Sequence, residues 1–142
     1  MLSVLLFSVV LLSSAQIGKI PAEVTDAFAA RYPHATKVEW RDKPGYYQAS
    51  FQLNGQHITA DFSSGGAWQR SERVLNYNDL PDEVQDGFQK SKFSDWNKNW
   101  IIESQESGKP LEYRMNIQKT GLKKKNLYFD VNGKLLKETI AL

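Results

Sequence analysis

The sequence contains no cysteine, and this absence narrows the chemistry that the protein can perform. Thiol catalysis, disulfide bonds and thiolate metal sites are excluded. A strong charge of one sign is also missing, because 18 Lys and Arg stand against 16 Asp and Glu, a net charge of +2. Nucleic-acid-binding proteins usually carry a strongly basic face, so this balance argues against a nucleic-acid partner.

Long apolar runs are equally scarce, and the one that is present lies at the N-terminus. Residues 2–12 are almost all apolar and are followed by the small residues Ser13, Ser14 and Ala15. This run is shorter than the roughly 20 residues that a membrane span needs. It predicts a signal peptide over residues 1–15, with a buried N-terminal helix or strand as the alternative. The protein is therefore expected in the periplasm or secreted, with no membrane span after cleavage.

The remaining chain matches itself at an offset of about 60 residues. Residues 20–28 read Ile-Pro-Ala-Glu-Val-Thr-Asp-Ala-Phe, and residues 80–88 read Leu-Pro-Asp-Glu-Val-Gln-Asp-Gly-Phe. Trp40 falls opposite Trp100, and two later segments match in the same order. Such ordered self-similarity predicts tandem copies of one structural unit.

Each copy begins with the pattern of a helix. Val24, Ala27 and Phe28 form one apolar stripe, and a proline precedes it, which suits a first helical position. Polar and apolar residues then alternate with a period of two, which is typical of strands with one buried face. Asn54-Gly55 and Asn132-Gly133 predict tight hairpin turns between such strands.

These patterns predict an α+β fold of two tandem copies, each a helix packed on one face of a three- to four-stranded antiparallel sheet. The expected limits are 16–75 for the first repeat, 76–79 for a short joint and 80–142 for the second repeat. The patterns leave open whether the two copies extend one another or face one another. By alternation, five aromatic side chains belong to the core: Trp40, Tyr47, Phe51, Phe62 and Phe129.

The chain after residue 15 resembles the PepSY-like family over essentially its whole length, and the first repeat matches better than the second; this family is also described as similar to the beta-lactamase-inhibitor protein. The resemblance rests on Ile20-Pro21-x-x-Val24-x-x-Ala27-Phe28, Tyr32-Pro33-x-Ala35, Val38-x-Trp40 and residues 47–53 and 62–68. It implies tandem helix-on-sheet modules of small exported proteins, typical of Bacteroidetes, with roles in inhibiting or holding other proteins. The shared positions are hydrophobic and turn residues, so they specify architecture and not chemistry.

A catalytic site is not apparent in the sequence. His34 and His57 are the only imidazole bases, and neither lies in a catalytic motif. Asp130 and Asn132 faintly resemble the start of a calcium loop, but the Asn-Gly turn explains them. We therefore expect no enzyme activity, no cofactor and no metal. A hydrolase whose carboxylate pair comes from different strands is the remaining catalytic alternative.

One dense charge cluster, Lys123-Lys124-Lys125, has two interpretations. It could hold an anionic partner, such as a lipopolysaccharide phosphate or an acidic protein surface. More often such a run is a solvated turn, or a set of lysines that protects a sheet edge from aggregation, and we favour this second interpretation.

The predicted function is that of a non-catalytic exported binding module, which binds or inhibits another envelope or secreted protein. The alternative is a small-ligand or glycan binder that uses aromatics between the two lobes. Aromatic residues outside the core phase are candidate anchors, since Trp and Tyr are frequent in interface hot spots. The predicted partner-binding residues are Tyr46, Trp68, Gln48, Gln52, His57 and Arg114.

Overall fold

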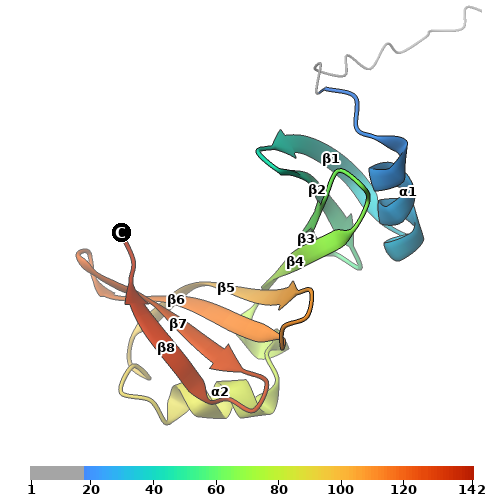
Figure 1. Ribbon diagram of the computed structural model, residues 1–142. Helices are drawn as coiled ribbons and strands as arrows, with labels where there is room; N and C mark the ends of the chain where they lie inside the picture. The colour runs from blue at the N-terminus through green and yellow to red at the C-terminus, as the bar shows by residue number, and fades with distance from the viewer. Residues whose placement is uncertain (1–17) are drawn as a thin grey trace, which may run out of the picture.

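The computed structural model describes residues 18–142, so the predicted signal peptide over residues 1–15 lies outside the described part. The described chain contains two α-helices, one short 3-10 helix and eight β-strands (Figure 1). In chain order they are α1 (Ala22–Arg31), β1 (Thr36–Lys43), β2 (Tyr46–Leu53), β3 (Gln56–Phe62), β4 (Trp68–Leu75), η1 (Tyr77–Asp79), α2 (Asp82–Gln89), β5 (Asn97–Glu106), β6 (Glu112–Thr120), β7 (Lys123–Asp130) and β8 (Leu135–Ile140).

All eight strands belong to one antiparallel sheet with the order β1-β2-β3-β4-β5-β6-β7-β8. Each strand pairs with the next along the chain; short connections join all of these pairs except β4 and β5, between which η1 and α2 lie. The Asn54-Gly55 turn between β2 and β3 is confirmed, with φ values of 52° and 76°. Positive φ at both positions is what a tight two-residue hairpin of this type requires.

The prediction of two tandem copies, each a helix on its own sheet of three or four strands, is wrong. Residues 70–75 of β4 pair with residues 101–106 of β5, so that a single eight-stranded sheet runs through the chain. The physical reason is that a free strand edge exposes unpaired N–H and C=O groups, and β4 and β5 satisfy each other's edges. The α+β class stands, and the limits 16–75, 76–79 and 80–142 stay a prediction.

Both helices lie on the same face of this sheet. Directly paired residues of neighbouring strands point to the same face. The pairing of Ile58 with Arg73, of Arg73 with Glu103, and onward through Tyr113 to Phe129 links the two halves on one face. We call this the covered face, and the opposite side the open face. Figure 1 shows α1 beside the first four strands and α2 beside the last four.

Two hydrophobic clusters fill the covered face, one under each helix. Val24 and Phe28 of α1 pack on buried residues of β2 and β3, including Phe51 and Phe62. The second cluster lies under α2: Leu75, Leu80, Val84, Phe88, Phe93, Ile101, Tyr113, Met115, Ile117, Leu127 and Phe129. All five aromatics predicted for the core belong to one cluster or pack against it. Neither α1 nor α2, the α-helices of the described part, has the length and apolar character of a membrane-spanning helix.

A polar strip separates the two clusters on the covered face. The Arg73 guanidinium donates to Gln56 Oε1 and to Glu103 Oε2, each at 2.9 Å. Tyr113 is 4% exposed beside this ion pair. Burial raises the pKa of Tyr113 to about 12, with the charge and hydrogen bond of Glu103 acting in the same direction and Arg73 opposing them.

This pKa predicts a loss of stability in alkali. The folded protein holds the Tyr113 proton more tightly than the unfolded chain does. The contribution of Tyr113 to the free energy of unfolding is therefore fully present below about pH 10. That contribution is lost as the pH rises from about 10 toward about 12. Urea unfolding at several pH values, compared with Tyr113→Phe, measures the effect. The variant should show the shallower fall in this window, and parallel curves for the two proteins would contradict the assignment.

Candidate binding surface

The open face carries ordered cross-strand rows of side chains, because no helix of the described chain packs on it. One row consists of successive directly paired residues from β4 to β8: Val74, Ile102, Arg114, Tyr128 and Lys137. Val74 is 48% exposed although it is apolar. The row therefore combines apolar, aromatic and basic contact area.

Trp100 is the exposed aromatic group beside this row. It pairs with Asn116 of β6 and is 38% exposed. The guanidinium carbon of Arg114 lies 5.3 Å from the centre of the Trp100 ring, within the range of a cation–π contact. Arg114 also lies 3.8 Å from the carboxylate of Glu72, which fixes the guanidinium between a ring and an anion. The exposed indole of Trp100 is therefore in contact with a cation that is itself paired with an anion.

A chain of side-chain amides continues from Trp100 toward the β7–β8 edge. Asn99 donates to Oδ1 of Asn116, and Asn116 donates to Oδ1 of Asn126, each at 2.8 Å. Asn116 is only 6% exposed, so its amide needs both partners. The amides and Trp100 line a shallow pocket of about 510 Å³, completed by Lys124, Ile140, Ala141 and Leu142.

The other end of the open face is organised around a buried carboxylate. Asp61 is 6% exposed and accepts hydrogen bonds from Gln48 and Arg70, each at 2.9 Å. Burial acts to lower the pKa of Arg70, but the hydrogen bond and charge of Asp61 outweigh it, so the pKa is raised. The buried carboxylate of Asp61 is thus paired with the guanidinium of Arg70, 2.9 Å away.

The structure places most of the predicted partner-binding residues on the open face. Gln48 pairs with Asp61, Gln52 pairs with His57, and Arg114 lies in the row described above. His57 and Gln52 are exposed, and they are separated from Arg114 by strands β4 and β5. The predicted residues on this face therefore form two groups.

The two predicted anchors occupy different positions. Trp68 pairs with Phe62 and packs on the α1 cluster, with the guanidinium of Arg31 stacked 3.7 Å from its ring centre. It belongs to the covered face. Tyr46 precedes Tyr47, which faces the α1 cluster, and so points to the open side. Both line a pocket of about 450 Å³ at the end of the sheet, together with Asp61, Gln69, Arg70, Glu106 and Ser107.

Sequence reasoning missed Trp100 as a surface residue. Trp40, its counterpart in the sequence match, packs against Phe28 in the core with ring centres 5.2 Å apart. In β5 the register shifts between Lys98 and Trp100. Such a bulge moves the following side chains to the other face of the sheet. Periodicity gives no sign of this bulge, because it depends on how β5 meets β6.

The possible metal ligands and the two histidines in the part of the chain that the structure describes do not gather into one site. Residues 18–142 contain no cluster of three or more His, Asp or Glu suited to a metal ion. His34 and His57 are exposed. Asp130 accepts hydrogen bonds from the backbone N–H groups of Asn132 and Lys134, so its carboxylate stabilises the hairpin turn.

Comparison with known proteins identifies relatives of this chain. The family described as beta-lactamase-inhibitor-like and PepSY-like matches residues 45–137. A BLIP-like protein from Bacteroides fragilis is similar in structure, with a TM-score of 0.81 and 30% identity over 87% of this chain and 89% of that chain. Among curated proteins, no significant match is found.

Two further structures share the fold. A DUF2874 family protein from Bacteroides ovatus has a TM-score of 0.81 and 23% identity, covering 86% of this chain and 88% of its own. A candidate periplasmic protein from Bacteroides eggerthii has a TM-score of 0.79 and 23% identity, covering 87% and 90%. At these identities the likeness shows the fold alone.

Proposed function

The chain belongs to the beta-lactamase-inhibitor-like, PepSY-like family, and on this premise we propose that it is an exported, non-catalytic protein that binds another envelope or secreted protein through its open face. The family description and the BLIP-like relative support a protein partner. The apolar run over residues 2–12 and the small residues after it, which predict a signal peptide, support an envelope location. The small-ligand or glycan alternative receives no support from these relatives.

The observation that carries the proposal is the one-sided covering of the sheet. Both helices lie on the same face, so eight strands present their other face without a covering element in the described chain. Near the middle of this face, Trp100 and Val74 are exposed beside Arg114. Aromatic and Arg side chains dominate the binding energy of protein interfaces, with polar groups around them.

Several charged side chains of the open face are paired with one another, which is typical of a preorganised binding surface. Asp61 is paired with Arg70, and Glu72 lies near both Arg70 and Arg114. Groups that are already held in place lose little side-chain freedom on binding, which lowers the cost of association.

Trp100→Ala should weaken partner binding by about 30-fold or more, which corresponds to the roughly 2 kcal/mol that defines a hot spot. Residues 16–142 serve as bait for affinity capture from an envelope extract, and the captured protein is then titrated calorimetrically against wild type and variant. Tyr46→Ala, measured in parallel, tests the predicted anchor at the other end of the face.

Leu122→Ser is the matched control, because Leu122 is exposed but lies at a hairpin tip. It should leave the affinity for the captured protein within about twofold. Circular dichroism melting confirms that each variant is folded. The open face is ruled out as the binding surface if Trp100→Ala and Tyr46→Ala both bind as tightly as wild type.

A further inference from the structure

The hairpin tip between β6 and β7 combines exposed apolar and basic side chains. Leu122 at this tip is 98% exposed, which leaves almost the whole side chain in water. Ile140, at the end of β8, pairs with Lys125 beside the same end of the sheet and is 80% exposed. Figure 1 shows the β6–β7 tip and the end of β8 side by side, on the side of the lower half away from α2.

Lysines surround this apolar tip on both faces of the sheet. Lys124 pairs with Gln118, two residues along β6 from Asn116, which places Lys124 on the open face. Lys123 and Lys125 alternate to the covered face. Lys125 is paired with Glu138 at 3.1 Å and Lys119 with Asp95 at 3.5 Å. No carboxylate within residues 18–142 forms an ion pair with Lys123 or Lys124.

This arrangement matches the chemistry of a lipid surface that carries negative headgroups. An apolar side chain at the leading end can enter the acyl region, while lysines on either side reach the phosphates of the headgroup layer. A soluble polyanion would pair with the lysines but would leave the apolar side chain of Leu122 exposed to water. Only an anionic bilayer therefore complements both the lysines, with its headgroup phosphates, and Leu122, with its acyl region.

We propose that the β6–β7 tip is a peripheral membrane anchor, in which Leu122 inserts into an anionic bilayer and Lys123 and Lys124 bind its headgroups. The anchor lies at the end of the strands, whereas the proposed partner surface is a face of the sheet. The protein can then dock end-on at a membrane, with Lys124 at the edge of the open face and the rest of that face accessible. This inference does not depend on the identity of the protein partner.

The test measures cosedimentation of residues 16–142 with vesicles of phosphatidylglycerol and phosphatidylethanolamine, mixed in a ratio of about three to seven. We expect binding at about 0.1 M salt that falls steeply at about 0.5 M, because the electrostatic part is screened. The double variant Lys123→Gln/Lys124→Gln should bind about 30-fold more weakly, and Leu122→Ser about tenfold. Phosphatidylcholine vesicles should retain little protein.

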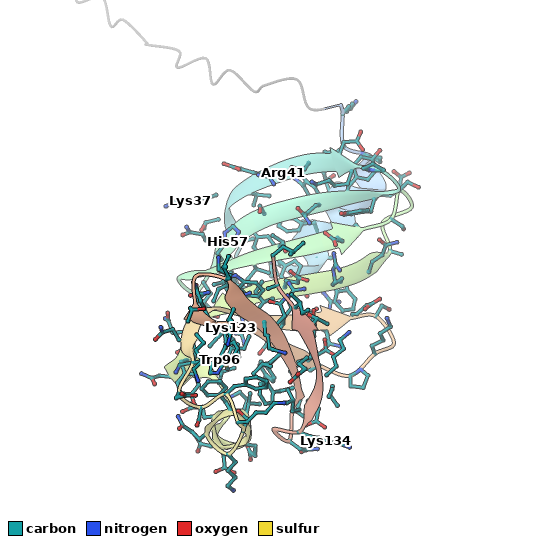
Figure 2. All side chains as sticks on the ribbon, turned by 90° about the vertical axis from the view of Figure 1, so that its left-hand side faces the viewer. Lys37, Arg41, His57, Trp96, Lys123 and Lys134 are labelled. Carbon is teal, nitrogen blue, oxygen red and sulfur yellow. The ribbon has the colours of Figure 1, made fainter. Side chains whose placement is uncertain are left out.

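The matched control is Lys37→Gln/Lys134→Gln, which removes the same charge from other parts of the surface. Figure 2 shows Lys37 in the other half of the molecule, and Lys123 and Lys134 at opposite ends of the β7–β8 hairpin. This control should bind within about twofold of wild type. Equal losses in the two double variants would mean attraction by net charge alone and would overturn the anchor.

Insertion of position 122 into the bilayer can be measured separately with a fluorophore on a single introduced thiol, because the chain lacks cysteine. Leu122→Cys and Ser64→Cys each provide one thiol for a polarity-sensitive fluorophore. Anionic vesicles should blue-shift and brighten the probe at position 122 and leave position 64, an exposed turn residue, unchanged. No binding to anionic vesicles, or binding without a signal from position 122, overturns the proposal. Wild-type affinity of Trp100→Ala for vesicles separates this result from the partner surface.

Discussion

Gly133→Ala is expected to lower the free energy of unfolding by about 3 kcal/mol and the melting temperature by about 10 °C. Gly133 has φ of +81°, a conformation that costs a side-chain-bearing residue about 1 kcal/mol. A Cβ at this position would also overlap the carbonyl oxygen of Glu83 in the first turn of α2. The helix would have to move away, and the packing of Val84 and Phe88 would loosen with it.

The same close approach exists from the helix side. A Cβ on Gly87 would overlap the carbonyl oxygen of Gly133, so both glycines are needed for α2 to lie on the β7–β8 turn. The control is Gly55→Ala, because Gly55 has a similar φ of +76° but no atom within 4 Å of the added Cβ. It should cost only about 1 kcal/mol. Urea unfolding followed by circular dichroism measures both, and equal losses would show that the helix contact is unimportant.

Phe28→Ala should lower the free energy of unfolding by about 3–5 kcal/mol. Phe28 is 7% exposed, and its ring centre lies 5.0 Å from that of Phe51, 5.2 Å from Trp40 and 6.3 Å from Phe62. Removing the ring leaves a cavity among rigid aromatic neighbours that cannot close around it. The cost should therefore lie at the upper end of the range for core truncations.

The loss in Phe28→Ala should affect the whole molecule. Since β4 and β5 pair directly, unfolding the first four strands exposes the edge of β5 as well. We expect one transition, seen together by circular dichroism and by tryptophan fluorescence from Trp40 and Trp68 in one half and Trp96 and Trp100 in the other. Phe88→Ala, a fully buried ring under α2, is the matched variant and should shift the same transition. Two separate transitions would contradict this coupling.

Local signals in the sequence were sufficient for the secondary structure. Proline followed by an apolar stripe located α1 and α2, and Asn54-Gly55 located the β2–β3 turn. Alternation assigned Phe51, Phe62 and Phe129 to the core, where each is at most 1% exposed. These features depend on residues within one turn or one strand, so the local chain specifies them.

The sequence was less informative about the candidate surface. It indicated an open polar face with Gln48, Gln52, His57 and Arg114, and the structure places these side chains there. It gave Trp68 and Tyr46 as anchors, whereas Trp68 packs under Arg31 on the covered face. Side-chain direction at the beginning of a strand depends on the local register, which the alternation alone does not define.

By itself, the sequence determined the family, the α+β class, the positions of the helices and hairpins, and the core residues of each half. Only the tertiary structure decided that β4 joins β5 in one sheet, and that the register shift at Lys98 and Trp100 turns Trp100 outward. The physical reason is the range of the interactions. Helix stripes and turns are specified by neighbouring residues, whereas strand pairing and bulges depend on backbone hydrogen bonds between segments far apart in the chain.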